Sequence, residues 1–212
     1  NDMAVIVGAI HGHTGMLIDL SPYKFRGPGG NGRPEPWVHV LPIPDEYRRE
    51  GTPFDSEVES ALEETGELAA LIIETMLSCA GQIPLPRGYL EAAKKATHAK
   101  GALLIADEVQ VGFGRVGSHM WAFEESGVVP DIVVMGKPMG NGHPMGAVFT
   151  TREIASAFGE MEFFSTVGGN PVSCAIGMAV LDVIEKDDLM ERATRLGDRL
   201  LEGLFELKKT YD

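Results

Sequence analysis

Short apolar runs alternate with segments of helical periodicity along most of the chain. Five runs, rich in β-branched and other apolar residues, predict strands: 3–7, 69–74, 102–106, 132–135 and 145–150. Residues 88–100 carry apolar side chains three and four positions apart, which predicts a helix. Strands separated by helical segments of crossover length predict a mostly parallel sheet with flanking helices. We therefore expect an α/β fold.

The last quarter of the chain is predicted to be helical. Asn170 offers a helix N-cap and Pro171 suits the first helical position, after which the apolar pattern runs to about Ile184. A second helix is expected from about Asp188 to Lys209, with an apolar face that has no partner within the chain.

Proline and glycine are concentrated in residues 21–53, which predicts a long surface excursion. Its Gly27–Arg33 run could be taken for a phosphate-binding loop. Such loops follow a strand and open a helix, however, and this run does neither. The preferred interpretation is a surface loop.

Composition narrows the classes of function. The chain has 212 residues, 44% of them hydrophobic, and a net charge of −13, which argues against nucleic acid and anionic membranes as partners. No apolar stretch reaches the roughly 18 residues of a membrane span. Cys79 and Cys174 lie far apart without ligand-spaced histidines, so no metal site is expected and a cytoplasmic location is favoured. With no initiator methionine at its start, the chain is expected to be part of a larger protein.

Two predicted strands end in groups that can carry chemistry. Asp107 closes one strand, and Lys137 follows another after Gly136. Ligands of open α/β sheets bind beyond the carboxyl ends of the strands. A desolvated lysine there has a lowered amine pKa and attacks an aldehyde, while a neighbouring aspartate keeps a pyridine ring protonated as an electron sink. Taken singly, a lysine after a strand is more often a solvated surface residue, and an aspartate at a strand end is more often a cap or a loop hydrogen-bond acceptor. Taken together, the two residues fit a site for pyridoxal 5'-phosphate (PLP).

Residues in these segments and near the start of the chain also fit two other kinds of site. An apolar run ending in Asp107-Glu108 also fits a nucleotide hydrolase, but that class needs a Gly-x-x-x-x-Gly-Lys-Ser/Thr loop. The single Gly-Lys of the sequence, ending at Lys137, is followed by proline. His11 and His13 could form a metal pair, yet a spacing of two on a loop, with no third ligand nearby, argues against one.

Three segments, in this order, resemble class III aminotransferases of the fold-type I PLP enzymes: Ile105–Arg115, Met135–Pro144 and Ser165–Pro171. The resemblance covers essentially the whole chain. It implies that residues 1–186 form the second half of the large PLP-binding domain. Residues 187–212 would then form a helix leading toward a C-terminal small domain. The turn that cradles the cofactor phosphate is expected upstream of this sequence.

The resemblance also implies roles by position. Lys137 matches the lysine that forms a Schiff base with PLP and shuttles the proton, and Asp107 matches the partner of the pyridinium nitrogen. Gln110 matches the residue at the phenolic oxygen, and Glu74 matches a glutamate near the ring. Thr166 matches the threonine that reaches the phosphate of the neighbouring subunit's cofactor, which implies a homodimer with shared active sites.

One position departs from the family pattern. His11-Gly12 falls where the family has an aromatic residue followed by His-Gly, and here Ile10 replaces the aromatic residue. Isoleucine can cover a ring face by van der Waals contact but lacks the stacking geometry of an aromatic side chain. The departure gives some support to an alternative, an inactive module that keeps the fold within a larger chain.

The implied activity is transfer of an amino group from a primary amine or amino acid to a 2-oxo acid. Some members carry a second glutamate as a gate for α-amino acids, and Cys79 occupies that position here. Ser78–Gln82 and Gly140–Pro144 resemble a subgroup of alanine–glyoxylate aminotransferase-like proteins and of phospho-lyases acting on phosphoethanolamine or phosphohydroxylysine. Elimination of phosphate is therefore the alternative reaction, and Lys137 and Asp107 serve both.

Overall fold

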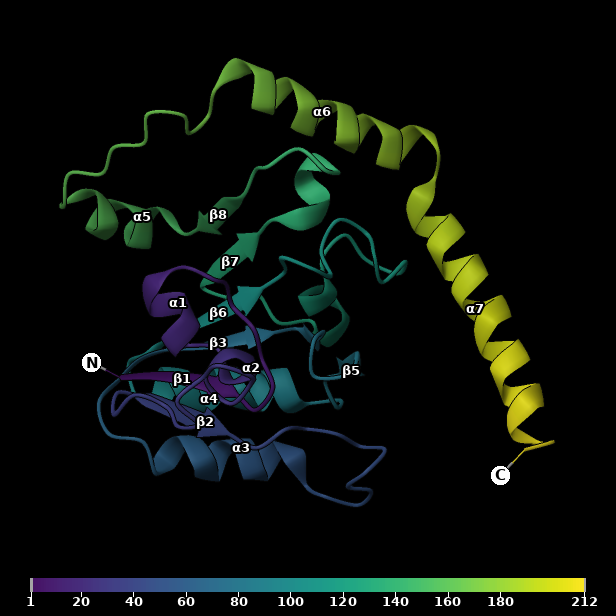
Figure 1. Ribbon diagram of the computed structural model, residues 1–212, viewed down its shortest axis with the longest axis horizontal. Coiled ribbons are helices and arrows are strands. Elements are labelled where there is room, and N and C mark those ends of the chain that lie inside the picture. Colours follow the sequence, from purple (N-terminus) through teal and green to yellow (C-terminus); the bar gives the residue numbers. More distant parts are fainter. Residues whose placement is uncertain (1, 212) are drawn as a thin grey trace.

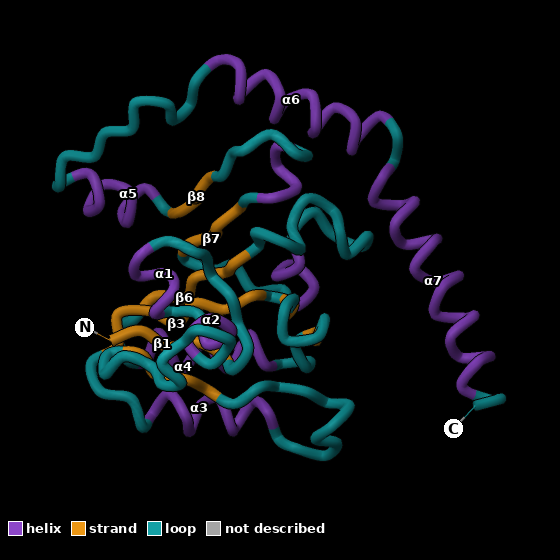
Figure 2. Tube along the Cα trace, in the orientation of Figure 1, coloured by secondary structure: helices purple, strands orange, loops and turns teal. Residues whose placement is uncertain are grey.

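A six-stranded sheet forms the centre of the computed structural model, which describes residues 2–211 (Figures 1 and 2). In spatial order its strands are β2 (Val38–Leu41), β1 (Asp2–Ile6), β3 (Leu68–Glu74), β6 (Leu103–Asp107), β7 (Ile132–Met135) and β8 (Ala147–Thr150). All neighbouring pairs are parallel except β7 and β8, which are antiparallel. The predicted α/β fold with a mostly parallel sheet is confirmed. Residues 1 and 212, the outer bounds of the two predicted segments, lie outside the described range.

Helices and short turns connect these strands. The α-helices are α1 (Gly15–Asp19), α2 (Pro22–Phe25), α3 (Phe54–Glu63), α4 (Tyr89–Ala99), α5 (Arg152–Gly159), α6 (Pro171–Lys186) and α7 (Leu189–Lys208). Two 3-10 turns, η1 (Ala122–Ser126) and η2 (Lys137–Gly140), follow β6 and β7 respectively. A small antiparallel hairpin of β4 (Met76–Leu77) and β5 (Ile83–Pro84) follows β3. The predicted helix over 88–100 is confirmed as α4.

Alternate residues of the central strands pack on opposite faces of the sheet. In β3, Leu71 and Ile73 are fully buried in a cluster formed with α3 and α4. Leu62 of α3 and Leu90 of α4 belong to the same cluster. Ile72 belongs to a second cluster that includes Leu20, from the segment after α1. Successive strand residues point to opposite faces, and a parallel sheet requires cover on both. This explains why the predicted strands read as nearly continuous apolar runs.

The segment 21–53 is more ordered than its composition predicted. Val38–Leu41 is not part of a surface excursion but an edge strand, β2, paired in parallel with β1 from Met3↔Val38 to Ile6↔Leu41. Pro22–Phe25 forms the short helix α2. The prediction was wrong there because the pairing partner of β2 is distant in sequence, while the local signal is dominated by proline and glycine. Gly27–Arg33 has no helix or strand, in keeping with a loop.

The C-terminal helices follow the sequence pattern closely. Asn170 caps α6, its side-chain oxygen accepting the N–H of Ser173 at 2.9 Å, and Pro171 opens the helix. Helix α7 projects away from the sheet (Figure 1), and none of its residues is buried. None of the described helices combines the length and the hydropathy needed to cross a membrane.

Candidate active site

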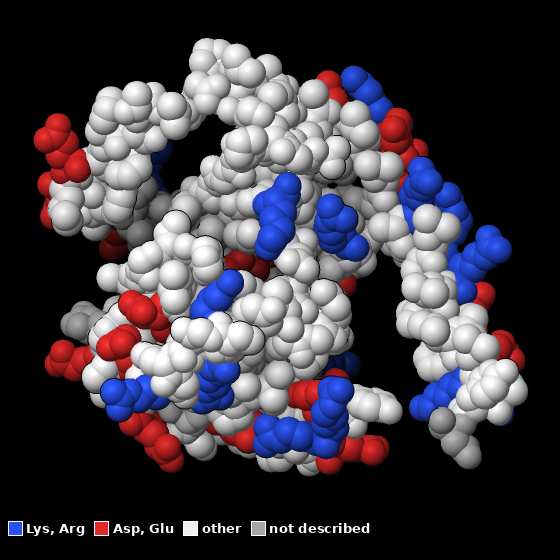
Figure 3. All heavy atoms as spheres, viewed as in Figure 1, with Lys and Arg blue, Asp and Glu red and all other residues white. Residues whose placement is uncertain are grey.

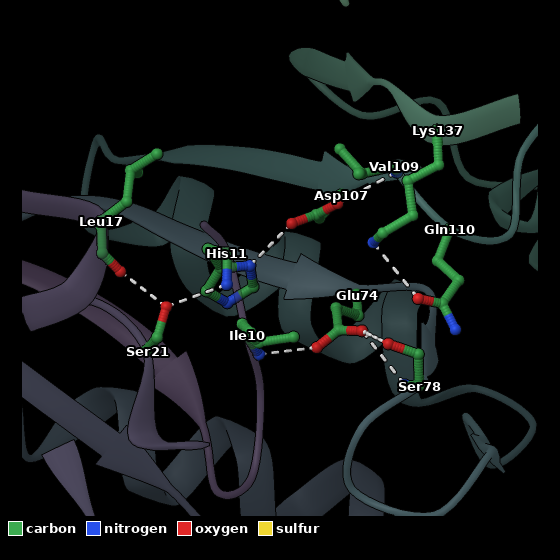
Figure 4. A network of polar contacts seen from close by, with 10 residues as sticks. All are labelled: Ile10, His11, Leu17, Ser21, Glu74, Ser78, Asp107, Val109, Gln110 and Lys137. Atoms are coloured by element: carbon green, nitrogen blue, oxygen red, sulfur yellow. Dashed lines mark hydrogen bonds and ion pairs between the residues drawn. The ribbon is translucent and has the colours of Figure 1, made fainter. Parts of the chain in front are cut away.

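The ends of three neighbouring strands bring the predicted residues together. Strands β3, β6 and β7 are parallel neighbours, so their carboxyl ends lie on one edge of the sheet. Glu74 ends β3, directly opposite Asp107 at the end of β6, and Lys137 comes two residues after β7. Figure 4 shows Lys137, Gln110, Asp107 and Glu74 grouped at this edge. A crevice at strand ends is where an α/β sheet binds its ligand.

Asp107 is buried and held from two directions. His11 donates its Nδ1 proton to Oδ2 of Asp107 at 2.8 Å, and the backbone N–H of Val109 donates to Oδ1 at 3.0 Å. The His11 side chain is fully buried, and that of Asp107 is 6% exposed. A carboxylate has about four lone-pair sites, so each oxygen keeps capacity for one more donor. Asp107 is therefore a fixed acceptor, not a mobile surface group.

Glu74 anchors the loop that carries Ile10 and His11. Its Oε1 accepts the N–H of Ile10 at 2.8 Å, while Oε2 accepts both the N–H of Ser78, at 3.0 Å, and the Ser78 hydroxyl. These contacts tie the N-terminal loop and the segment after β3 to the end of the sheet. In the structure, the Glu74 carboxylate therefore holds these two segments in place. Its contact with a cofactor ring stays a prediction.

Further contacts fix the loop at His11 and Gly12. The N–H of His11 donates to the Ser21 hydroxyl at 2.9 Å, and that hydroxyl donates to the Leu17 carbonyl at 2.6 Å. Gly12 has φ of +146°, and a Cβ there would lie 2.7 Å from Cδ1 of Leu17. Only glycine fits both this backbone conformation and this close approach. The Ile10–Gly12 segment is consequently held rigidly beside Asp107.

Lys137 lies at the start of η2, with its amine directed toward the loop after β6. Its Nζ donates to Oε1 of Gln110 at 3.2 Å (Figure 4). The sequence predicted a desolvated amine, and this was wrong for the described chain, in which Lys137 is exposed. The reason is that the turn η2 projects past the sheet edge into an open cavity of about 520 Å³, lined in part by Gln110.

Thr166 is the one predicted site residue that does not join this group. It lies in the exposed segment between α5 and α6, whereas the other seven converge on the strand ends and the loop beside them. The resemblance assigns Thr166 to a neighbouring subunit's site. Its contribution to a partner's site stays a prediction.

Glu108 has a role that sequence reasoning missed. It points away from Asp107 into the core and is fully buried. Its carboxylate accepts the N–H groups of Ala122 and Phe123, both at 3.0 Å, and the hydroxyl of Thr75 at 2.6 Å. Burial raises the pKa of the Glu108 carboxyl, against the opposing effect of these bonds. The three donors lie 14, 15 and 33 residues from Glu108 along the chain, so no local sequence pattern predicts these hydrogen bonds.

The donor set fits PLP. Asp107 would offer a fixed carboxylate to a protonated ring nitrogen, Lys137 an amine to the aldehyde, and Gln110 an amide to the phenolic oxygen. Nε2 of His11 is buried without a hydrogen-bond partner among the described residues, next to the point where such a ring would sit. Buried nitrogens normally have a hydrogen-bond partner, so a water or another polar group from outside the described chain is expected at this nitrogen.

Comparison with known families agrees with this geometry. The family model "Aminotransferase class-III" matches residues 2–212. The chain belongs to the class III aminotransferase family. Within this family it is 47% identical to the alanine–glyoxylate aminotransferase 2-like protein of Drosophila melanogaster, over 100% of this chain and 46% of the relative. It is 39% identical to ethanolamine-phosphate phospho-lyase homolog 1 of Caenorhabditis elegans, over 100% of this chain and 50% of that protein.

A solved structure of the family gives the same result at the level of the fold. A phospholyase from Arthrobacter, in complex with phosphoethanolamine, superposes with a TM-score of 0.84 at 35% identity, covering 96% of this chain and 50% of that one. The chain thus spans about half the length of these class III relatives.

Proposed function

We propose that this chain is part of a PLP-dependent class III aminotransferase, which moves an amino group from a primary amine or amino acid to a 2-oxo acid. Residues 1–186 form the second half of its large domain, and residues 187–212 lead toward a small domain. The observation that carries the proposal is the meeting of Asp107 and Lys137 at the ends of adjacent strands, with Asp107 pinned by His11 at 2.8 Å.

The proposal gives each residue of the strand edge a task. Asp107 holds the ring nitrogen in its protonated form through a charge-assisted hydrogen bond, and His11 and Val109 keep its carboxylate aimed. Ile10 and His11-Gly12 would help to hold the ring, and Ile10 would give it van der Waals contact instead of aromatic stacking. Bound there, the cofactor supplies an aldehyde that captures the amine and a cationic ring that draws electrons from the substrate carbon.

Lys137 both binds and moves a proton. Its amine would hold the cofactor before substrate arrives, and once free it would take up and return the proton of the substrate carbon. The hydrogen bond from Nζ to Gln110 limits how far the free amine swings away. This restraint supports a shuttle, because proton transfer needs the donor and acceptor within hydrogen-bond reach.

We further propose a homodimer in which Thr166 reaches the phosphate of the partner's cofactor. The exposed position of its segment between α5 and α6 supports this arrangement. A cytoplasmic location is proposed from cysteine usage alone, and alanine–glyoxylate aminotransferase 2 of Homo sapiens, 36% identical to this chain, is named as mitochondrial.

Cofactor capture at Lys137 tests the proposed function and separates it from an inactive module. The full-length protein mixed with PLP is expected to show a visible absorption band. Borohydride should make the link permanent, and peptide mass mapping should find it on Lys137. Lys137→Ala should lose the band, whereas Lys208→Ala, an exposed lysine on α7, should retain it. A protein that forms no adduct under these conditions is an inactive module.

Phosphate elimination is the second candidate, and it is supported by the phospho-lyase relatives in worm and Arthrobacter. The same lysine and aspartate serve both reactions, so the products of the reaction have to distinguish phosphate elimination from amino transfer. Released phosphate from phosphoethanolamine identifies a lyase. Transfer of the amino group to pyruvate, without phosphate release, identifies a transaminase.

A further inference from the structure

The turn that carries Lys137 continues as a run of tight turns to His143. The N–H of Asn141 donates to the carbonyl of Pro138 at 3.1 Å, and the N–H of His143 donates to the carbonyl of Gly140 at 2.9 Å. Asn141 has a φ of +45°, in the left-handed region that asparagine adopts more readily than most residues. Because hydrogen bonds close these turns one after another, the backbone position of His143 is linked to that of Lys137.

The His143 side chain reaches from this run of turns to the first turn of α6. Its Nε2 lies 2.8 Å from the hydroxyl oxygen of Ser173. A protonated ring nitrogen donates and an unprotonated one accepts, while a hydroxyl can do either, so both tautomers of His143 allow this hydrogen bond. The same hydroxyl oxygen accepts the side-chain NH2 of Asn170 at 3.0 Å. One atom of Ser173 therefore joins His143 to the N-cap residue of α6.

The N-cap residue in turn contacts the segment that carries Thr166. The side-chain NH2 of Asn170 donates to the carbonyl of Val167 at 2.9 Å, and its side-chain oxygen accepts the N–H of Ser173. Val167 directly follows Thr166 in the chain. A path of hydrogen bonds therefore runs without a break from the turns after β7 to the residue next to Thr166.

The remaining contacts between α6 and the turn η2 are apolar (Figure 1). Met145 lies between them, since a Cβ on Gly140 would be 2.9 Å from its Cγ and a Cβ on Gly177 of α6 would be 3.1 Å from its Cε. Residues 163–181 contain no charged side chain that could form an ion pair. On the face drawn in Figure 3, the N-terminal part of α6 is correspondingly free of Lys, Arg, Asp and Glu. Apolar contact is not directional, so the hydrogen bond from His143 orients the helix on the turn.

We propose that His143 is a positioning residue that couples the two active sites of the homodimer. Through the turns after β7 it keeps Lys137 in place for the site of its own subunit. Through Ser173 and Asn170 it keeps Thr166 in place for the site of the partner. The inference rests on the proposed function, in which Lys137 binds the cofactor and Thr166 reaches the phosphate in the partner's site.

Hydrogen–deuterium exchange of the cofactor-free, full-length protein tests the hydrogen-bond path independently of activity. His143→Ala should raise the exchange rate over residues 165–173 about 2- to 10-fold, the factor that one hydrogen bond is worth. Ser173→Ala removes the same hydrogen bond from its other side and should act alike. His143→Gln keeps an amide that can bond to the hydroxyl and should exchange at nearly the wild-type rate. Unchanged exchange in both alanine variants overturns the path.

His98→Ala is the matched control. Nε2 of His98 also makes a hydrogen bond of 2.8 Å, to Asp131. Asp131 precedes β7 and Lys137 follows it, so this bond lies at the opposite end of the strand. The variant should leave exchange over residues 165–173 unchanged. Equally fast exchange in His98→Ala would show a general loosening of the chain and would refute a specific path through His143.

Mixed dimers of the full-length protein separate coupling between sites from support of one site. Two chains with different purification tags are co-expressed, and one of them carries Lys137→Ala. A single site survives, with Lys137 from the unaltered chain and Thr166 from the altered one. His143→Ala is then placed either on the chain that keeps Lys137 or on the other chain. The second placement should weaken PLP binding at the surviving site about 2- to 10-fold, measured by titration of the visible absorption band.

The outcomes separate this inference from the proposed function. An effect only when His143→Ala lies on the chain that keeps Lys137 refutes the coupling, and so does failure to recover any species with both tags. If His143→Ala does not fold by circular dichroism, Ser173→Ala takes its place in both arms. The borohydride adduct at Lys137 is read separately in the wild type. Its absence refutes the proposed function and the coupling together, whereas an adduct with no effect of the second placement refutes the coupling alone.

Discussion

Replacing Glu108 by glutamine tests whether this buried carboxylate holds the segment that follows β6 in place. The glutamate accepts three hydrogen bonds, from Thr75, Ala122 and Phe123, and has no solvent exposure. Glutamine has the same shape but places an NH2 where one carboxylate oxygen stood. The Thr75 hydroxyl can rotate and accept from that NH2, whereas a backbone N–H cannot.

The expected loss in free energy of unfolding follows from how many of these donors keep an acceptor in the Glu108→Gln variant. Whichever way the amide is turned, either Ala122 or Phe123 loses the acceptor for its N–H. A buried donor without a partner costs about 1–3 kcal/mol, so Glu108→Gln should lower the free energy of unfolding by that amount. Glu108→Ala removes all three acceptor contacts and leaves a cavity, and its loss should be larger. Domains of ordinary size are stable by only about 5–15 kcal/mol, so both effects are measurable.

Urea denaturation followed by circular dichroism is the assay, and Glu125→Gln is the matched control. Glu125 lies on the same turn, η1, and accepts the Ser118 hydroxyl at 2.6 Å, but it is exposed. Its replacement should change the free energy of unfolding by less than about 0.5 kcal/mol. Equal stabilities for the Glu108→Gln variant and the wild type would show that the Glu108 carboxylate does not stabilise this segment.

The same variant carries a pH prediction. Burial raises the pKa of Glu108 in the folded protein above its value in the unfolded chain. The stability from this group is therefore fully present below the unfolded pKa and is lost as pH rises through the folded pKa. Glutamine does not titrate. The difference in unfolding free energy between wild type and Glu108→Gln should therefore grow as the pH is lowered from about 7 toward about 4, and a difference that shrinks contradicts the assignment.

Three further predictions concern the core and the site. Gly112→Ala should lower the free energy of unfolding by about 1–3 kcal/mol in urea, because a Cβ would lie 2.9 Å from the Trp121 ring; wild-type stability would contradict this overpacking. His11→Ala should cost about 1.5–3 kcal/mol in the same assay, since Asp107 loses its buried donor, and a neutral result would show the pair to be unimportant. Burial raises the pKa of Tyr89. A spectrophotometric titration should therefore find that one of the four tyrosines ionises only when the protein unfolds. Ionisation of all four tyrosines in the folded protein would contradict this prediction.

Gly66 supplies the control for the Gly112→Ala variant. Gly66→Ala adds a Cβ with no heavy atom within 4 Å and at no positive φ, so its stability should match wild type. A loss in both glycine variants would point to a general effect of adding a side chain and not to the contact with Trp121.

The strands and the proposed catalytic pair, Asp107 and Lys137, can be identified from the sequence because their signals are local. Apolar runs such as Ile132–Met135 must be buried on both faces of a parallel sheet, and such burial leaves a continuous pattern. Asp107 and Lys137 follow two such runs, and the rule that ligands bind at the carboxyl ends of strands made their meeting predictable. The helix start at Asn170-Pro171 is local in the same way.

Features that depend on distant partners were missed or misjudged. Strand β2 was hidden among prolines and glycines, because its identity comes from pairing with β1 and not from its own four residues. The exposure of Lys137 could not be foreseen either, since it depends on what covers the end of β7. Glu74 was expected near a ring, and the structure shows both of its oxygens occupied by Ile10 and Ser78.

Local patterns in the sequence therefore indicate the fold class, the positions of the main strands along the chain and the two residues around which the chemistry is proposed. These follow from burial, turn chemistry and strand ends, which act over short stretches of chain. Three contacts come from the tertiary fold: His11 binds Asp107, Glu108 holds the segment after β6, and Arg115 lines the same cavity as Lys137. Each of these contacts joins residues far apart along the chain, and sheet pairing and core packing alone determine which of them meet.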